Sequence, residues 1–244
     1  MRILSILIIM IFATFVAKSD QIYEIIKLPN LEIYSDSKNK IKFLFAKDSV
    51  NAGMGIVSIN CEKPIKKDLD NKIIISDENL KRYSTFFLNE INLKYIVFCD
   101  KLKISEINAN GFANPRMRTI VLNTSTHKKI FNRVLHHEIF HIIHHNYKTR
   151  FNEKEWYSFN KFNFSYSSCG TCEDSSSLKL LKTTNGFFTD YSKYSVSEDM
   201  AETFSFVMTE NNIVREKLKN DEILREKVNF IKKNILKIDE NFKF

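Results

Sequence analysis

Apolar residues recur at intervals of three and four positions in the middle of the chain, and no Gly or Pro interrupts them. They are Ile130, Phe131, Val134, Leu135, Ile139, Ile142 and Ile143. This spacing is typical of one face of an α-helix. Three short polar residues just upstream, Thr124, Ser125 and Thr126, are candidates for its N-cap. The pattern therefore predicts one long helix at the centre of the chain.

The first half of the chain contains shorter apolar runs that are typical of β-strands. Strands are predicted at residues 31–34, 41–45, 56–59, 95–99 and 117–123. A helix is predicted from a cap at Ser76 or Asp77 to about Ile91. Its apolar face consists of Leu80, Tyr83, Phe87 and Ile91. Residues 104–115 show no regular pattern and are predicted to form a loop.

Beyond the central helix, a second helix is predicted from Ser197 to about Thr209. An apolar stripe along residues 211–244 indicates further helices that pack behind it. The intervening residues 146–186 are aromatic and polar with little periodicity. Their aromatic side chains either line a cleft or cover the core, and the sequence leaves both possibilities open.

The central helix carries the pattern H-E-x-x-H, as His137-Glu138-Ile139-Phe140-His141. Residues i and i+4 of a helix lie one turn apart on the same face, so both imidazoles can bind one metal ion. The Glu beside the first His can reach a water on that metal and act as a general base. We therefore predict one catalytic Zn²⁺ at His137 and His141, and not histidines that are merely packed or solvated.

All six histidines of the chain lie between His127 and His145. Catalytic zinc usually has three protein ligands and one open position, so the third ligand must be a carboxylate or a thiolate. Glu198 and Glu202, one turn apart at the start of the second helix, are best placed. We predict that Glu198 binds zinc and that Glu202 hydrogen-bonds a ligand histidine, since carboxylates that face a core need a cationic partner. The alternative is a pair of ordinary acids favoured by the helix dipole.

The N-terminus has the features of an export signal. Arg2 precedes an apolar run from Ile3 to Val16, and residues 17–19 offer a small-x-small cleavage site. The run is short for a membrane span, and the alternative is an uncleaved anchor. We expect residues 1–19 to be a signal peptide that is removed. The chain is then secreted or periplasmic and keeps no stable membrane span.

The remaining residues, 20–244, suit one domain with a sizeable core. We divide it into N-terminal strands and a helix to residue 115, a catalytic core of residues 116–210, and C-terminal helices in residues 211–244. The whole chain has a formal net charge of +8, but its lysine-rich pieces alternate with acidic and apolar residues. That distribution is typical of solvated faces, so we expect no nucleic-acid partner.

The four cysteines are Cys61, Cys99, Cys169 and Cys172. Export makes disulfides the expected state. One arrangement pairs Cys61 with Cys99 and Cys169 with Cys172, but four cysteines allow three arrangements and the sequence does not choose among them. Cys169 and Cys172 also have the spacing of a redox or zinc-ribbon motif, although the context of either motif is missing.

The motifs resemble those of the gluzincins, in which a later Glu is the third zinc ligand. The segment 198–204, with Tyr191 seven residues before Glu198, resembles the E-x-x-A-E-x-F segment of the anthrax lethal factor and Pro-Pro endopeptidase group. The aromatic residues from Trp156 to Tyr166 and the segment 186–191 are similar to those of bacterial exported zinc-binding metallopeptidases. The resemblance covers about residues 117–208 and does not extend to the N-terminal hundred residues.

The resemblance implies that Tyr191 hydrogen-bonds the oxyanion of the transition state. The residues agree, because the oxyanion needs a donor and no distant His can supply one; Tyr194 is the rival. The chain departs from the lethal-factor group in its longer, Cys-containing insert and in His136, His144 and His145 around the motif. Substrate preference therefore does not transfer, and the role of these three histidines stays open.

These motifs predict an α+β fold with a zincin-like lobe, in which a small mixed sheet precedes two ligand-bearing helices and a helical C-terminus. The predicted activity is peptide hydrolysis outside the cytoplasm. Zn²⁺ is held by His137, His141 and Glu198. Glu138 takes a proton from the attacking water and passes it to the leaving nitrogen, while Tyr191 stabilises the oxyanion.

The strand at residues 117–122 directly precedes the metal-binding helix, as in a zincin lobe. We predict that it borders the cleft and pairs with an extended peptide substrate; the alternative is an internal strand. Two other functions compete with this prediction: a non-catalytic zincin-like protein for zinc binding or adhesion, and a toxin-like protease that acts on host proteins. The intact Glu138 argues against the first, since a pure binder needs no general base.

Overall fold

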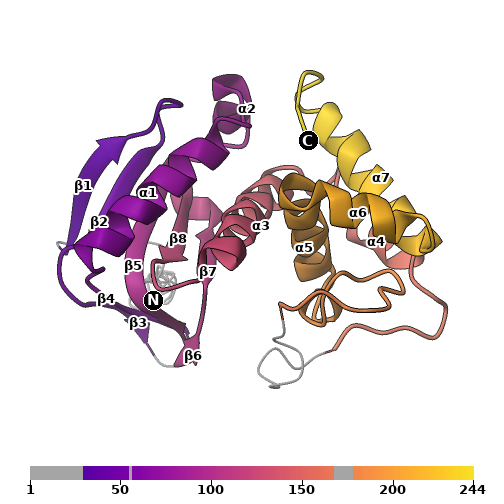
Figure 1. Cartoon of the computed structure of the whole chain (residues 1–244), viewed down its shortest axis with the longest axis horizontal. Helices are drawn as coiled ribbons and strands as arrows, with labels where there is room; N and C mark the ends of the chain where they lie inside the picture. The colour runs from indigo at the N-terminus through magenta and orange to yellow at the C-terminus, as the bar shows by residue number, and fades with distance from the viewer. Residues whose placement is uncertain (1–29, 55–56, 168–177) are drawn as a thin grey trace, which may run out of the picture.

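A computed structural model describes residues 30–54, 57–167 and 178–244, so the predicted export signal and the pair Cys169 and Cys172 lie outside the described residues. Figure 1 shows the strands gathered on one side of helix α3 and the C-terminal helices on the other. The strands are β1 Leu31–Asp36, β2 Lys42–Ala46, β3 Val50–Met54, β4 Val57–Glu62, β5 Tyr95–Ile104, β6 Ile107–Asn108, β7 Gly111–Asn114 and β8 Thr119–Asn123. The helices are α1 Lys66–Leu80, α2 Thr85–Glu90, α3 Lys128–Asn146, α4 Glu153–Ser158, α5 Val196–Thr209, α6 Asn211–Leu218 and α7 Glu222–Leu236, with 3₁₀ turns η2 Pro115–Met117 and η4 Tyr191–Lys193.

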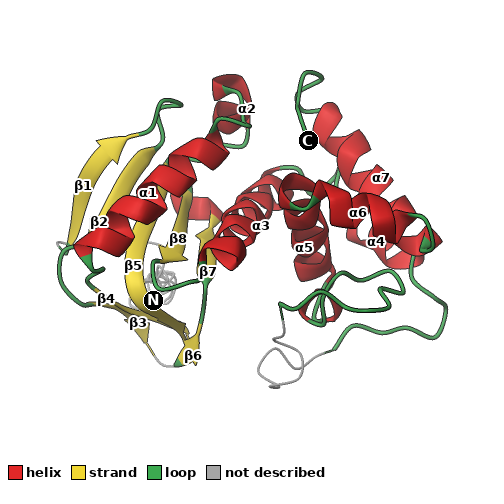
Figure 2. Cartoon of the chain, viewed as in Figure 1, coloured by secondary structure: helices red, strands yellow, loops and turns green. Residues whose placement is uncertain are grey.

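Strand β5 is the centre of a mixed sheet, because it has partners along both of its edges. Its first half lies parallel to β2 on one side and to β8 on the other. Its second half pairs antiparallel with β4 and β6. Hairpins add β1 to β2 and β3 to β4, and β7 lies antiparallel to β8. The sheet and the helices around it (Figure 2) confirm the predicted α+β class.

Alternate side chains of β5 enter two different cores. Ile96 and Phe98 pack in the larger cluster together with residues of α1 and α3. Val97 and Cys99 belong to a second cluster, formed with residues of β2, β3 and β4. Since successive strand residues point to opposite faces, a strand with both faces covered needs a continuous apolar run. The run at residues 95–99 therefore correctly predicted a buried strand.

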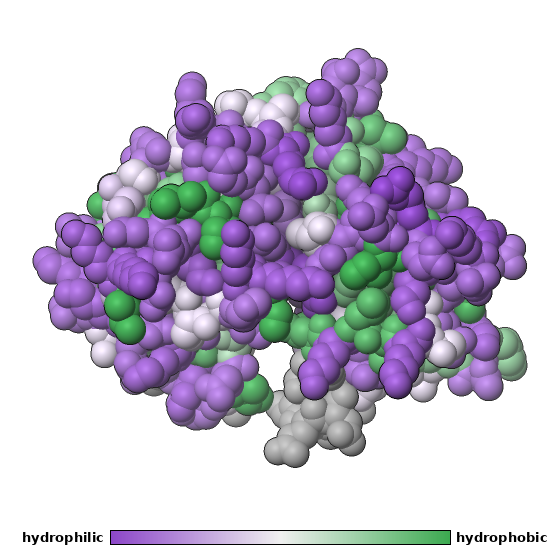
Figure 3. Space-filling view, viewed as in Figure 1, coloured by the Kyte–Doolittle hydropathy of each residue, from purple (hydrophilic) through white to green (hydrophobic). Residues whose placement is uncertain are grey.

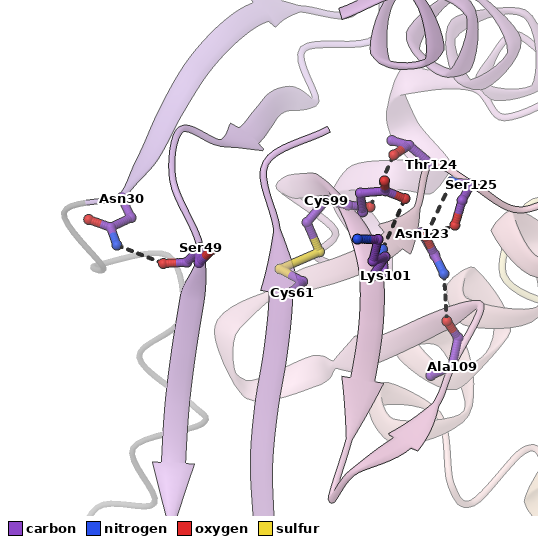
Figure 4. The surroundings of a disulfide bond; sticks show 10 residues. Asn30, Ser49, Cys61, Cys99, Lys101, Ala109, Asn123, Thr124 and Ser125 are labelled. Atoms are coloured by element: carbon purple, nitrogen blue, oxygen red, sulfur yellow. Dashed lines mark hydrogen bonds between the residues drawn. A yellow bond between two sulfur atoms is a disulfide. The ribbon is translucent and has the colours of Figure 1, made fainter. Parts of the chain in front are cut away.

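Cys61 of β4 and Cys99 of β5 form a disulfide, with their Cα atoms 5.8 Å apart (Figure 4). The same end of β5 is joined to the segment that leads into α3. The Thr124 hydroxyl donates to the Cys99 carbonyl at 3.3 Å, and the Asn123 amide donates to the Ala109 carbonyl at 3.1 Å. The sequence left three cysteine pairings open, and the structure contains the pairing of Cys61 with Cys99.

The helix predicted at residues 76–91 is wrong in its bounds. Helix α1 begins at Lys66 and ends at Leu80, and Ser76 is buried within it. A turn follows, and α2 begins after Ser84, whose hydroxyl accepts a hydrogen bond from the Phe87 N–H at 2.9 Å. The start of α1 was missed because its first turns are mostly charged and polar. The four residues of the predicted apolar face are nevertheless buried in one cluster.

The strand predicted to border the cleft is also corrected. Strand β8 lies inside the sheet, between β5 and β7, and all five of its residues are buried. Strand β7 lies next to α3, and among the described strands it pairs only with β8. It falls within residues 104–115, which were predicted to form a loop. A strand of four residues is too short for its alternation to be read from the sequence.

The second predicted helix is present as α5, and the predicted C-terminal helices are present as α6 and α7. Phe206 and Val207 of α5 pack against Val214 of α6 and against Leu224 and Val228 of α7. The two segments that connect these helices are one and three residues long, which keeps consecutive helices in contact. Within the described residues, no helix has both the length and the apolar character that crossing a bilayer requires.

Candidate metal centre

Helix α3 presents the H-E-x-x-H residues toward α5. The N-cap of α3 is His127, whose ring nitrogen accepts from the Lys129 N–H at 3.4 Å. The three polar residues predicted as caps therefore lie just before the cap itself. His137 is buried and His141 is half-buried, one turn further along the same face.

Helix α5 brings two carboxylates to His137. The Ser195 hydroxyl caps this helix by accepting from the Glu198 N–H at 3.2 Å, so Glu198 lies in the first turn and Glu202 one turn later. Glu198 Oε2 lies 2.9 Å from Nε2 of His137, and Glu202 Oε1 lies 3.1 Å from Nδ1 of the same ring. Each nitrogen of His137 thus faces one of the two acids that were predicted to act together.

Three ligand atoms converge on one point. His137 Nε2 lies 3.1 Å from His141 Nε2, and Glu198 Oε2 lies 2.9 Å and 3.4 Å from these two nitrogens. In a tetrahedral site with zinc–ligand bonds of about 2.0–2.1 Å, two ligand atoms are about 3.3 Å apart. The observed separations are close to this value. In the described part of the chain, this is the one group of such residues with metal-binding geometry, and it fits a zinc ion.

The charges of the site favour a cation. Burial alone would raise the pKa of Glu198, but His141 and His137 beside it lower that pKa well below its ordinary value. Burial alone would lower the pKa of His137, but its hydrogen bonds to Glu198 and Glu202 raise the pKa well above 6.5. The carboxylates therefore favour positive charge at the ring nitrogens, and a metal ion can supply that charge in place of a proton.

Glu202 is itself held by two residues that the sequence did not identify. The Thr189 hydroxyl donates to Glu202 Oε2 at 2.8 Å, and Arg133 Nη2 lies 3.4 Å from the same oxygen. Glu202 is only 2% exposed, so these contacts offset the cost of burying its charge. A carboxylate at Nδ1 can only accept, so it keeps the proton on Nδ1 and leaves Nε2 free for the metal.

The side chain of Glu138 lies directly beneath strand β7. A Cβ atom at Gly111 would lie 2.7 Å from Glu138 Oε1 and 2.6 Å from a methyl group of Val134. Glycine at this position therefore lets β7 pass close over α3. Burial raises the pKa of Glu138 above its ordinary value, which brings it closer to neutral pH, where a general base works best.

Tyr191 belongs to the 3₁₀ turn η4, just before α5. Its ring centroid lies 5.9 Å from that of His137, and its side chain lines the same cleft as Glu198. Burial, followed by the charges of Glu198 and Glu138, raises the pKa of Tyr191, so the phenol keeps its proton and remains a donor. The ring of Tyr194, the rival, stacks on Tyr191 at 6.3 Å between centroids. Of the two, Tyr191 is the residue in contact with the predicted ligands.

A cleft passes over the three ligand atoms. Its walls are residues 107–113 on the sheet side and Tyr191, Tyr194 and Glu198 on the helical side, and one face of α3 forms its floor. In the space-filling view the surface is notched between these two sides (Figure 3). Strand β7 pairs with β8 along one edge, and no other strand of the described residues pairs with its second edge, which lies at the cleft wall.

The aromatic segment after α3 covers the core, and none of its described aromatic residues lines the cleft. Instead, Trp156 Nε1 and the Tyr166 hydroxyl donate to Asp199 Oδ2 at 2.8 Å and 2.7 Å. Lys227 of α7 donates to the same oxygen at 2.7 Å, and neither charged side chain of this pair is exposed to solvent. This unpredicted cluster anchors the first turn of α5, where Asp199 directly follows Glu198.

His136 faces away from the metal centre and has a structural role. It is fully buried, with Nδ1 accepting from the Tyr83 hydroxyl at 2.5 Å and Nε2 lying 3.1 Å from Asn79 Oδ1. Burial, with a smaller effect of Arg82, lowers the pKa of His136 to about 3. The ring is therefore neutral in the folded protein at all pH values of interest.

This neutral histidine predicts a loss of stability in mild acid. The unfolded chain takes up the proton near pH 6.5, whereas the folded chain does so only near pH 3, so the free energy of unfolding falls as the pH falls between these values. We expect a slope of up to about 1.4 kcal/mol per pH unit from this ring. Urea unfolding at pH 7, 6 and 5 measures it. A His136→Gln variant should be less stable at pH 7 but show a shallower slope; equal slopes in both proteins would contradict the assignment.

Comparisons with known proteins agree with this geometry. Residues 102–239, more than half of the chain, match the family described as "Putative zinc-binding metallo-peptidase". The chain belongs to this family. The matched region contains α3 and α5, and thus all three candidate ligands of the metal.

A solved structure extends the likeness to most of the chain. The crystal structure of a "putative zinc-binding metallo-peptidase" from Bacteroides caccae ATCC 43185 matches with a TM-score of 0.52 and 16% identity. The match covers 84% of this chain and 80% of that chain, and at this identity it shows a shared fold. Among curated protein sequences, none matches the chain. A zincin-like arrangement is present in this chain, with His137 and His141 on α3 and Glu198 on α5.

Proposed function

We propose that this metallopeptidase family member is a zinc-dependent peptidase. The observation that carries the proposal is the set of three ligand atoms at tetrahedral spacing with Glu138 beside them on the same helix. Glu138 has no place among the metal ligands and is buried under β7, where a general base can face the cleft. A protein that only binds zinc has no need of this carboxylate.

The chain's own residues supply the proton transfers. A bound Zn²⁺ lowers the pKa of a water and polarises the scissile carbonyl. Glu138 accepts the proton of the attacking water and then delivers it to the leaving nitrogen. Tyr191, protonated and next to Glu198, donates a hydrogen bond to the oxyanion as charge develops there. The resemblance of residues 191–204 to the lethal factor and Pro-Pro endopeptidase group supports this role of Tyr191.

The substrate in this proposal is an extended peptide that pairs with β7. This strand replaces the predicted strand at residues 117–122, because β8 already has partners on both edges. Backbone pairing to a strand edge gives affinity that does not depend on sequence, and pockets beside it select side chains. Both β7 and the Glu138 side chain line the same cleft, so the pairing would place a peptide bond beside the base.

We also propose that the protein works outside the cytoplasm, as secreted or periplasmic. The apolar run after Arg2 supports export, and the disulfide between Cys61 and Cys99 fits an oxidising compartment. Measuring the N-terminal residue of the protein recovered from an expressing cell tests this. Recovery in the cytoplasm with Met1 retained would contradict it.

Metal removal tests the function. We expect the purified protein to hold one zinc per chain and to cleave members of a mixed peptide library, and a chelator to abolish the cleavage. A His137→Ala variant should lose stoichiometric zinc, because one of three ligands is gone. Zinc content is measured by elemental analysis and cleavage by mass spectrometry. Cleavage that survives the chelator would contradict the proposal, and bound zinc without cleavage would favour the non-catalytic zinc-binding function.

The close approach of β7 predicts the effect of one added methyl group. A Gly111→Ala variant would place its Cβ within 2.8 Å of two Glu138 side-chain atoms, so either the strand or the base must move. We expect the rate of peptide cleavage to fall by about 100-fold, since small misplacements of catalytic groups have effects of this size, while zinc content is unchanged. An Ala113→Gly variant of the same strand is the control. Full activity of Gly111→Ala would show that Glu138 is not held by β7.

A further inference from the structure

Ser197 lies between two histidines of α3 at the edge of the metal centre. Its hydroxyl oxygen is 3.2 Å from Nδ1 of His141 and 3.4 Å from Nδ1 of His144. His144 in turn has Nε2 at 3.5 Å from Glu153 Oε1, a carboxylate in the first turn of α4. The Ser197 hydroxyl thus links His141, a predicted zinc ligand, to His144, a buried histidine that is neither a predicted ligand nor a predicted catalytic group.

The two ligand histidines are supported by groups of different kinds. Nδ1 of His137 faces the Glu202 carboxylate, which can only accept a hydrogen bond. Nδ1 of His141 faces a hydroxyl, which can donate or accept. If Ser197 donated to Nδ1, the proton of His141 would lie on Nε2 and block the atom that faces the metal. The support of His141 therefore works only if the Ser197 proton points elsewhere.

His144 offers the acceptor for that proton. The ring is 6% exposed, and burial lowers its pKa to about 4, so it is neutral and carries a single N–H. The Glu153 carboxylate near Nε2 favours the proton on that nitrogen, which leaves the Nδ1 lone pair facing Ser197. The ring is held in place by stacking on Phe140, at 6.2 Å between centroids.

We propose that His144 is a positioning residue for the metal centre. It accepts the Ser197 proton, so that Ser197 accepts the proton of His141 Nδ1 and His141 presents Nε2 to the metal. The inference rests on the proposed zinc function, and it gives a role to one of the three histidines that the sequence left unexplained. The neighbouring His145 is exposed on the rim of the cleft and has no part in this chain of hydrogen bonds.

Two substitutions separate the two nitrogens of His144. In a His144→Asn variant the amide oxygen can take the place of Nδ1, so the acceptor for Ser197 is kept. In a His144→Gln variant the longer side chain puts its amide near Nε2, and the acceptor is lost. We expect His144→Gln to weaken zinc binding about 10-fold, as is common for residues that support a metal ligand, and His144→Asn to bind like the unaltered protein.

The zinc dissociation constant is measured by competition with a chromophoric chelator, and the visible spectrum of the Co²⁺-loaded proteins reports the ligand geometry. Ser197→Ala should weaken zinc binding as His144→Gln does, and the double variant should lose no more than either single one, because both act through one hydrogen bond. His145→Asn is the matched control and should leave the dissociation constant and the spectrum unchanged.

The outcomes distinguish this inference from the proposed function. If the unaltered protein binds no zinc, the proposed function fails. If it binds zinc and His144→Gln binds equally well, or His144→Asn is as weak as His144→Gln, the positioning role is overturned. Additive losses in the double variant would also overturn it. Should His144→Gln fail to fold, as judged by its unfolding midpoint, the spectrum and affinity of Ser197→Ala and His144→Asn still decide the matter.

Discussion

A Glu138→Gln variant is expected to lose peptide cleavage by about 10²–10⁴-fold, which is the usual contribution of a positioned general base. Glutamine has nearly the shape of glutamate, so the packing under Gly111 is kept. Its amide cannot accept the proton of the attacking water. Because His137, His141 and Glu198 are untouched, the variant should retain one zinc per chain.

The measurement compares the rate of cleavage of a peptide that the unaltered protein cuts with the rate for the variant at equal zinc content. A loss of kcat with little change in KM is expected, since Glu138 acts on the reaction and not on binding. Unchanged kcat in a zinc-loaded Glu138→Gln protein would exclude Glu138 as the base and, with it, the mechanism proposed here.

A Lys227→Met variant is expected to have the largest effect on stability. It leaves Asp199 buried without its cationic partner, and breaking a buried ion pair in this way typically costs about 3–5 kcal/mol. The Trp156 and Tyr166 donors remain, but they do not neutralise the carboxylate. Since Asp199 follows Glu198 in the first turn of α5, we also expect zinc affinity to fall.

Urea unfolding of the metal-free proteins measures this change. Lys233→Met on the exposed side of the same helix is the matched control and should change the free energy of unfolding by no more than about 0.5 kcal/mol. The double variant Asp199→Asn, Lys227→Met removes both charges and should recover part of the loss. If Lys227→Met were as stable as Lys233→Met, the ion pair would not anchor α5.

The metal-binding part of the fold could be predicted because its signals are local. The pattern H-E-x-x-H requires only that residues 137–141 be helical, and the apolar spacing around them established that. Because no histidine lies outside residues 127–145, the third ligand had to be a carboxylate or a thiolate, and Glu198 was the best-placed carboxylate. The pairing of Glu202 with a ligand histidine followed from the helical spacing of the two acids, and the structure contains that contact.

The parts that could not be predicted depend on contacts between distant segments. Strand β7 has only four residues and is stabilised by pairing with β8. Its own sequence pattern therefore predicts neither the strand nor its place at the cleft. From the sequence, Asp199 resembles any acidic residue in the first turn of a helix, so its buried ion pair was not predicted. Its partner Lys227 lies 28 residues further on and reads as a surface lysine of an amphipathic helix. Arg133 and Thr189 were missed for the same reason.

The disulfide between Cys61 and Cys99 has a consequence for the unfolded chain. The two cysteines are 38 residues apart, and the loop they close contains α1 and α2. A covalent loop of this length removes conformational entropy from the unfolded state worth about 4 kcal/mol at 25 °C in the chain-entropy treatment. That amount is a large part of the net stability of an ordinary domain, about 5–15 kcal/mol. The folded state of this chain therefore depends on the redox conditions around it, through two residues that take no part in metal binding.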